Sequence, residues 1–186
     1  YNFINLSRDQ IEAKPEESIY QLRRSFIADE QLYSIFLGRN LGEIIPHEVQ
    51  KAALKNLDET RGLGHTKGLV VFATGLGKTY LSGFDAIQLA AKKILFIVHI
   101  GEILKQTRNS FEEIMPGRVS EMGFFTGTDK DKEKNILFAT IQTLTRPKNL
   151  NQFNTDDFDY VILAETHHLA APSYKKVFEY FKPKFF

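Results

Sequence analysis

The sequence contains no cysteine, no long apolar run and almost no excess of charge of either sign. Without cysteine the chain forms neither disulfides nor thiolate metal sites, and a cytoplasmic location is the default expectation. A membrane-spanning helix needs about 18 or more consecutive apolar residues. No run approaches that length, so we expect no membrane partner. The 24 basic and 23 acidic residues leave a formal net charge of +1, so binding of DNA or RNA would depend on local groups.

Two regions of the 186 residues differ in their pattern. Residues 1–44 show helical periodicity without a strand, so we expect a helical N-terminal extension or the tail of a preceding domain. Residues 45–186 alternate short apolar runs with helical segments, which is typical of parallel βαβ units. The sequence therefore predicts an α/β fold with helices on both faces of a parallel sheet. The expected strands are residues 69–72, 94–99, 122–127, 136–140 and 160–165, and the expected helices are residues 48–61, 78–91, 101–114 and 173–181.

A phosphate-binding loop is predicted where the first of these strands leads into a helix. The stretch "ATGLGKT" places Gly75, Gly77, Lys78 and Thr79 in the spacing G-x-G-K-T. Glycine lets backbone N–H groups approach a phosphate, and a helix start adds donors and a positive dipole end. Lys78 is expected to reach the β and γ phosphates as a catalytic group, and the Thr79 hydroxyl is expected to bind Mg²⁺. The alternative is a glycine turn that only leads into a helix. The candidate nucleotide-binding residues here are Thr74, Gly75, Leu76, Gly77, Lys78 and Thr79.

The same stretch resembles the Walker A motif of superfamily 2 helicases and translocases, whose first position is often not glycine; here it is Phe72. The upstream "IPHEVQKAAL" is similar to the glutamine motif of that family, so the resemblance implies that Gln50 binds the N6 and N7 edge of adenine. It also implies a P-loop NTPase (RecA-like) fold, ATP and Mg²⁺ as cofactors, and a second RecA-like lobe in the same parent chain. The chain begins at Tyr1 and ends in "YFKPKFF", where a further strand is expected to start. We therefore expect it to be part of a longer protein.

Three further stretches resemble the nucleic-acid motifs of the DEAH-like, restriction-enzyme branch of that family. "FIVHIGEILKQT" is similar to its motif Ia, which implies that His99 lies near the nucleic acid, although Ile100 stands where an arginine is expected. "FFTG" and "FATIQTL" resemble two later motifs of the first lobe. Hydroxyls, amides and backbone N–H groups at strand ends hold phosphates without net charge. The remaining candidate contacts to the backbone phosphates of DNA or RNA are Thr126, Gly127, Thr140 and Gln142.

The stretch "DYVILAETHHLA" resembles the Walker B segment of the same branch. The resemblance implies that Glu165 activates the attacking water and that His167, with His168 beside it, links the nucleotide state to the second lobe. The metal-side aspartate of the motif is replaced by Ala164. A buried strand has no need of an acid at this position, so the lost group is one that serves the metal. We hypothesise that the protein binds ATP but hydrolyses it poorly, through either an inactivating substitution or natural degeneration.

Three classes of function fit these features. The leading hypothesis is the first RecA-like lobe of a DNA or RNA helicase or translocase, similar to the helicase subunits of restriction or phage-defence systems, which often carry a nuclease domain. A second is another P-loop enzyme such as a kinase, which the order of the motifs disfavours. A third is a non-enzymatic nucleotide-sensing module, for which Ala164 is the main argument.

Overall fold

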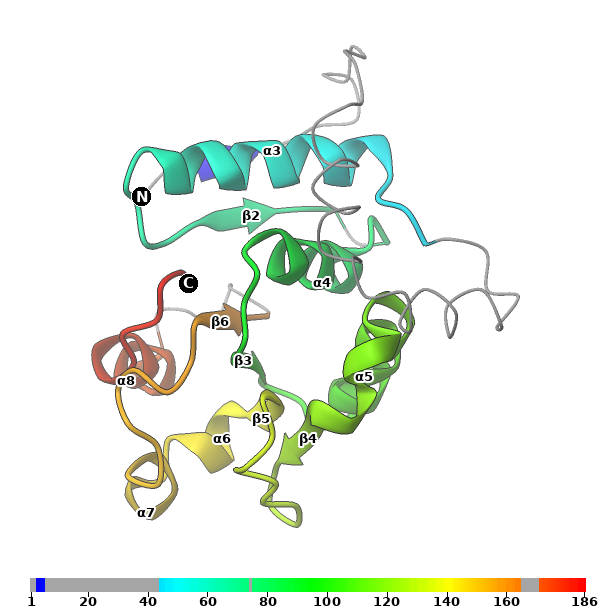
Figure 1. Ribbon diagram of the computed structural model, residues 1–186. Helices are drawn as coiled ribbons and strands as arrows, with labels where there is room; N and C mark the ends of the chain where they lie inside the picture. Colours follow the sequence, from blue (N-terminus) through cyan, green and yellow to red (C-terminus); the bar gives the residue numbers. More distant parts are fainter. Residues whose placement is uncertain (1–2, 6–43, 74, 165–170) are drawn as a thin grey trace.

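The centre of the molecule is a parallel four-stranded sheet in the order β4-β5-β3-β6. The computed structural model describes residues 3–5, 44–73, 75–164 and 171–186 (Figure 1). The strands are short apolar runs, and β3 is buried on both faces of the sheet, which explains why its sequence is apolar throughout. The four strands are β3 (Ile94–Val98), β4 (Met122–Phe125), β5 (Ile136–Thr140) and β6 (Tyr160–Leu163).

Helices cover both faces of this sheet (Figure 1). Successive side chains of a strand point to opposite faces, and in β3 the residues Ile94, Phe96 and Val98 join one apolar cluster while Leu95 and Ile97 join the other. We call these the α4-side and α8-side clusters. The first is lined by α3 (Glu48–Gly62), α4 (Lys78–Gln88) and α5 (Glu102–Ile114), and the second by α6 (Ile141–Leu144), α7 (Pro147–Leu150) and α8 (Pro172–Tyr180). The predicted architecture is therefore confirmed.

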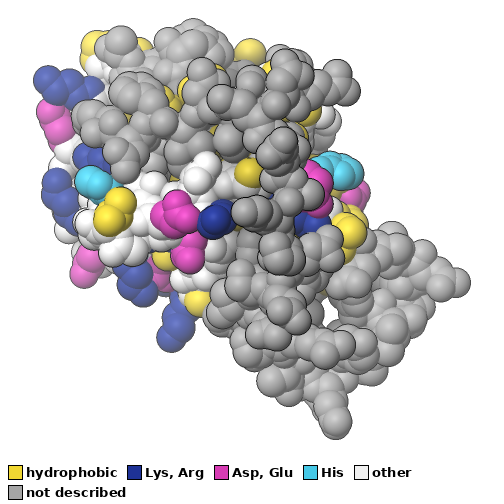
Figure 2. All heavy atoms as spheres, turned by 90° about the horizontal axis from the view of Figure 1, so that it is seen from above, with side chains coloured by type: hydrophobic (Ala, Val, Ile, Leu, Met, Phe, Trp, Pro, Cys, Tyr) yellow, Lys and Arg dark blue, Asp and Glu magenta, His cyan; other side chains and the backbone are white. Residues whose placement is uncertain are grey.

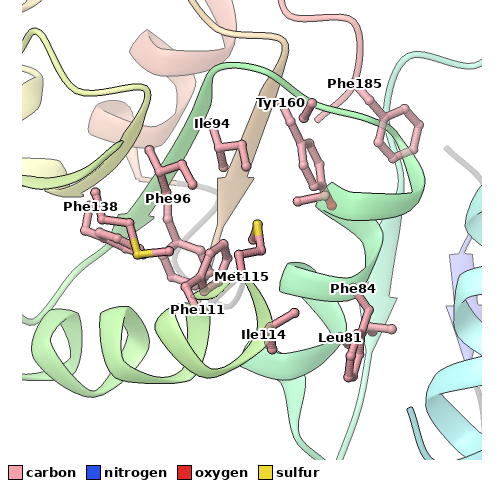
Figure 3. Close-up of a cluster of buried hydrophobic side chains, with 14 of the residues drawn as sticks. Leu81, Phe84, Ile94, Phe96, Phe111, Ile114, Met115, Phe138, Tyr160 and Phe185 are labelled. Carbon is pink, nitrogen blue, oxygen red and sulfur yellow. The ribbon is translucent and has the colours of Figure 1, made fainter. Parts of the chain in front are cut away.

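Aromatic rings fill the α4-side cluster between α5 and the sheet (Figure 3). The ring of Phe111 on α5 meets Phe96 and Phe138 edge to face, at centroid distances of 5.7 and 5.3 Å. Such pairs are among the preferred aromatic geometries. A 3-10 helix, η1 (Pro116–Glu121), then returns the chain to β4. None of the helices within the described residues has the length and apolar content of a membrane-spanning helix.

A second pair of parallel strands, β1 (Phe3–Asn5) and β2 (Leu69–Val71), lies beyond β6. The end of the chain connects the two sheets. Phe185 forms a parallel bridge with Tyr160 at the start of β6, and the backbone N–H of Gly68 donates to the oxygen of Phe186 at 2.9 Å. The segment "KFF" therefore pairs as a strand between β6 and the residues that lead into β2.

One expectation about the N-terminal region was wrong. Residues 1–44 were expected to contain no strand, yet Phe3–Asn5 pairs in register with Leu69–Val71. A strand of three residues is too short to give a periodic signal, and its partner lies far along the chain. Residues 6–43, which hold the rest of the predicted helical extension, are outside the described residues. The division of the chain at residue 44 stays a prediction.

A buried polar network joins three elements of the α4 side. Arg61 of α3 donates from Nη1 to both carboxylate oxygens of Asp85 on α4, at 2.9 and 3.0 Å, and the hydroxyl of Tyr160 on β6 donates to Oδ2 at 2.7 Å. The Asp85 side chain is fully buried, and the Phe185 ring lies 5.0 Å from the centre of the Arg61 guanidinium. Burial raises the pKa of Asp85, while Arg61 and the Tyr160 hydroxyl oppose that rise.

Charges on the surface of α3 are paired within the helix. Lys51 and Glu48 lie 2.7 Å apart, and Lys55 and Glu59 lie 3.7 Å apart. Figure 2, which looks onto the top of Figure 1, shows basic and acidic side chains interspersed over the described part of this face. The described part of this face therefore shows no single-sign patch that would attract a highly charged partner.

Removing one member of the buried network should destabilise the protein far more than removing an exposed ion pair. We expect Asp85→Ala to lower the free energy of unfolding by about 3–5 kcal/mol, because it leaves a buried guanidinium without its partner. Tyr160→Phe should lower it by about 1–2 kcal/mol. The control Glu59→Ala should change it by no more than about 0.5 kcal/mol. Urea unfolding measures all three, and an Asp85→Ala loss as small as the control would contradict the structural role of the network.

Candidate nucleotide and nucleic-acid site

The loop between β2 and α4 has the backbone conformation of a glycine-dependent anion cradle. Gly75 and Gly77 adopt positive φ angles of 86° and 73°, which are costly for residues with a Cβ atom. A Cβ at Gly77 would lie 2.5 Å from Nε2 of Gln50, whereas nothing lies within 4 Å of one at Gly75. Gly77 is therefore required both by its torsion angle and by a close neighbour. Thr74 lies outside the described residues.

The start of α4 is chemically suited to an anion. No side chain caps this helix, and no acidic residue lies in its first turn, so its first N–H groups are oriented toward the loop without a carboxylate competing for them. The ammonium of Lys78 lies over the loop and donates to the backbone oxygens of Phe72 and Ala73, at 3.3 and 3.4 Å. The phenyl ring of Phe72 is buried in the α4-side cluster. This position thus contributes a carbonyl to the loop and a side chain to the core.

Gln50 is packed against the phosphate loop. Its side chain is 2% exposed, and Nε2 donates to the oxygens of Gly77 and Leu76 at 3.1 and 3.3 Å. Its Oε1 accepts from the backbone N–H of His47 at 2.8 Å, which closes a capping box at the start of α3. The sequence pointed to Gln50 as part of the nucleotide site, and the structure places its amide on the loop. Its predicted contact with adenine stays a prediction.

The other candidate residues lie at the carboxyl edge of the central sheet. Val98 pairs with Thr140, and Phe125 pairs with Ala139, so the residues that follow β3, β4 and β5 lie at the same edge. Ile97 pairs with Leu163, which places Ala164 at that edge on the other side of β3. In open α/β sheets, ligands bind beyond this edge of the strands.

Two predicted nucleic-acid residues contact each other directly. Nε2 of Gln142 lies 3.2 Å from Nδ1 of His99, and this contact joins the end of β3 to the start of α6. Thr140 is the residue before α6, and its methyl group lies 3.5 Å from where a Cβ of Gly101 would be. Ile100, which replaces the arginine of the motif, is 48% exposed beside them. The structure thus brings His99, Thr140 and Gln142 together.

Thr126 and Gly127 lie in a tight turn after β4. The Thr126 hydroxyl donates to Oδ2 of Asp129 at 3.0 Å, and its backbone N–H donates to the oxygen of Asp129 at 2.9 Å. Hydrogen bonds from Thr128 and Thr126 lower the pKa of the Asp129 carboxyl. The ammonium of Lys130 in turn donates to the Thr126 oxygen. Neither Asp129 nor Lys130 was singled out from the sequence, although Thr-Asp pairs of this kind are a turn signal.

The Walker B segment is described as far as Ala164. This residue is partly buried against the α4-side cluster, and its N–H donates to the oxygen of Ile97 at 2.9 Å. Glu165, His167 and His168 lie outside the described residues, so the structure does not place them. Among the residues that are described, no group of three His, Asp or Glu side chains is arranged to hold a metal ion.

Comparison with known proteins supports both the fold and the family. Residues 43–186 match the family described as "Type III restriction enzyme, res subunit". IRC3 of Saccharomyces cerevisiae, which is assigned as an ATP-dependent helicase, is 31% identical over 124 residues, covering 61% of this chain and 17% of IRC3. The type I restriction enzyme EcoAI endonuclease subunit of Escherichia coli is 28% identical over 148 residues, covering 73% of this chain and 18% of that subunit. The chain thus spans less than a fifth of the length of either relative.

A solved structure agrees with the same fold. It is the "hypothetical ATP-dependent RNA helicase from Sulfolobus tokodaii", with a TM-score of 0.57 and 18% sequence identity, covering 87% of this chain and 44% of that one. At this identity the likeness shows the fold alone, and the fold is the RecA-like one predicted from the motifs. The chain therefore belongs to the family of type III restriction enzyme res subunits, and it contains the first RecA-like lobe of a superfamily 2 helicase.

Proposed function

We propose that the protein binds ATP at the loop of residues 73–79 and couples that binding to contact with the phosphate backbone of DNA or RNA. The observation that carries this proposal is the arrangement of the sheet. The candidate nucleic-acid residues follow β3, β4 and β5, and the Walker B strand β6 lies directly beside β3. A movement of residues at the end of β6 would therefore reach the candidate nucleic-acid residues at the end of the neighbouring strand, β3.

The residues of the loop fit the phosphates of ATP. Backbone N–H groups of residues 75–79 and the uncapped start of α4 supply donors, and Lys78 exchanges its present carbonyl partners for phosphate oxygens. Gln50 keeps the loop in shape through Gly77 and Leu76, and its position beside the loop agrees with a role in adenine recognition. The Thr79 hydroxyl, at the first turn of α4, would hold Mg²⁺. The metal ion, when bound, neutralises phosphate charge.

Hydrolysis is the step that we propose to be impaired. In the proposed site Glu165 orients and deprotonates the attacking water, and His167 transmits the state of the site to the second lobe. Ala164 supplies no carboxylate for the metal and its water ligands. Loss of a supporting ligand of this kind typically lowers metal affinity or activity by about 10 to 100-fold. Binding through the loop and Lys78 is expected to persist.

On the nucleic-acid side, His99, Thr126, Gly127, Thr140 and Gln142 would contact backbone phosphates. Such contacts position a strand without reading its sequence, so they fit DNA and RNA equally. A second RecA-like lobe in the parent protein would complete the motor. A nuclease domain is a further proposed partner, because one relative is named an endonuclease subunit.

A nucleotide-sensing module without turnover is the second candidate function. The observation that favours it is Ala164, whose methyl group packs against the apolar α4-side cluster and offers no ligand to a metal. A module of this kind would still bind ATP and signal through the same sheet edge. The two candidates differ in whether a restored carboxylate produces turnover.

Restoring the carboxylate tests the impairment. We expect Ala164→Asp in the full-length protein to raise nucleic-acid-stimulated ATP hydrolysis by about 10-fold or more, because a metal-side acid is returned to the site. Ala164→Asn, which adds similar volume without charge, is the matched control, and Lys78→Ala should abolish the gain. If Ala164→Asp and Ala164→Asn hydrolyse ATP at the same rate, position 164 is not the defect.

The loop glycines test nucleotide binding. We expect Gly77→Ala to weaken binding of a non-hydrolysable ATP analogue by about tenfold or more, because the new Cβ is strained and collides with Gln50. Gly75→Ala is the matched control, since its φ is also positive but its surroundings are open. In a double-mutant cycle, Gln50→Ala should harm the Gly77→Ala protein less than it harms the original. Equal losses for the two glycine variants would contradict the role of the Gln50 contact.

Coupling of the two ligands tests the motor. We expect the protein to bind single-stranded nucleic acid in a salt-sensitive manner, with an affinity that changes when an ATP analogue is added. By reciprocity, the nucleic acid should change the affinity for the analogue by the same factor. Fluorescence anisotropy with labelled DNA and RNA measures this. If neither nucleic acid changes nucleotide affinity in the two-lobed protein, the motor proposal fails while nucleotide sensing remains.

A further inference from the structure

Four cations surround the end of β4, beside residues that the proposed function places on the nucleic acid. They lie on α5, on the connection between β4 and β5, just before α7 and within α7. All four side chains are exposed. We call them the cationic rim, and its members are Lys105, Lys130, Arg146 and Lys148.

Lys130 is held rigidly at the centre of the rim. The β4–β5 connection folds back so that Lys130 forms an antiparallel bridge with Phe125. Its ammonium donates to the oxygen of Thr126 and lies 4.6 Å from the centre of the Phe125 ring. That ring packs edge to face on Phe153, just after α7, at 5.1 Å. The connection and the α7 region thus contact each other through the α8-side cluster, and the charges of Arg146 and Lys148 lie close enough to act on Lys130.

The rim carries more positive than negative charge, although the carboxylate of Asp129 lies close enough to interact with Lys105 and Lys130. Within the described part of the chain, no acidic side chain forms an ion pair with Lys105, Arg146 or Lys148, whereas Lys55 and Lys175 lie against glutamates. Burial lowers the pKa of Lys130, and the nearby charges of Arg146 and Lys148 lower it further, while the charge of Asp129 opposes this change. Like charges that outnumber the nearby counter-charges favour an anionic ligand.

The motif residues beside the rim cannot supply this attraction themselves. Thr126, Gly127, Thr140 and Gln142 are neutral, and the motif arginine is replaced by Ile100. Neutral contacts orient a strand, but affinity for nucleic acid depends largely on cations that release counterions from the phosphates. Gln142 lies at the start of α6, and Arg146 lies between α6 and α7. Both side chains are exposed, so both can contact a ligand along the segment that joins β5 to α7.

We propose that the cationic rim binds the phosphodiester backbone of a single-stranded nucleic acid next to Thr126 and Gln142. This inference rests on the proposed function and adds to it the groups that set affinity and salt dependence. The rim binds DNA and RNA alike, because its ammonium and guanidinium groups contact phosphates and not the edges of the bases. It takes no part in ATP binding, which in the proposed site occurs on the β6 side of the sheet, whereas the rim lies on the β4 side.

The test compares two variants that remove the same charge from opposite edges of the sheet. The rim variant is Lys130→Gln, Arg146→Gln and Lys148→Gln. The control variant is Lys92→Gln, Lys93→Gln and Lys182→Gln, whose exposed lysines lie at the amino edge. Binding of unstructured single-stranded DNA and RNA is measured against salt concentration. We expect the rim variant to lose about tenfold in affinity at low salt and about 2 units in the slope of log affinity against log salt, and the control to lose little of either.

Three outcomes overturn the inference, and they are distinguishable from failure of the proposed function. If the original protein binds nucleic acid and the rim variant keeps the slope of the control, the rim is not the contact and the proposed function stands. If affinity falls for RNA alone, groups other than phosphates are recognised. If the original protein binds no nucleic acid, both proposals fail. An unchanged affinity of the rim variant for the ATP analogue shows that the variant is folded. The double variant Arg146→Gln with Lys148→Gln keeps the hydrogen bond from Lys130 to Thr126, so its loss of affinity reflects the removed charges alone.

Discussion

The geometry of the proposed site depends on the buried contact of Asp85 with Arg61 and Tyr160. Each of these residues belongs to a helix or strand that also carries, or leads to, a residue of the proposed site. The helix of Asp85 starts at the phosphate loop, the helix of Arg61 carries Gln50, and the strand of Tyr160 leads to Ala164. A buried ion pair adds little net stability over apolar packing, but it is costly to break or to rearrange. It therefore fixes the relative positions of α3, α4 and β6, and with them the distance between the loop and the Walker B strand.

The pairing of the strands in the central sheet extends this fixed geometry to the residues that follow β3 and β5. β3 is buried along its whole length, and its alternate side chains enter the two apolar clusters, so a shift of one residue in its register would exchange the clusters. The same register holds the ends of β5 and β6 level on either side of it. The end of the Walker B strand and the ends of β3 and β5 consequently lie at one edge of the same sheet. Movement between them must come from the loops at the edge, where His99 contacts Gln142.

Local sequence patterns predicted most of this fold, but they did not predict the contacts between segments that are far apart in the sequence. The strand at Ile136–Thr140 was predicted with the observed bounds, because an apolar run between polar residues is a strong local signal. The glycine loop that leads into α4 was also predicted, since its glycines and lysine are close together in the sequence. Its binding of phosphate stays a prediction. The pairing of Phe3–Asn5 with β2 was missed, as were the short helices α6 and α7 and the buried contact of Arg61 with Asp85. These features depend on which segments meet in space, and no spacing along the chain encodes that.

The charge distribution explains how a nearly neutral lobe is suited to a polyanion. The exposed lysines Lys55 of α3 and Lys175 of α8 each lie near a glutamate one helical turn away, so they create little field. The cationic rim carries more positive than negative charge, and it lies beside the neutral motif residues at the ends of β4 and β5. Replacement of the motif arginine by Ile100 removes a cation from the end of β3. In the proposed binding mode, the main electrostatic contact lies near β4 and α7, so the nucleic-acid strand would be held mainly on the side of the sheet opposite to β6 and the phosphate loop.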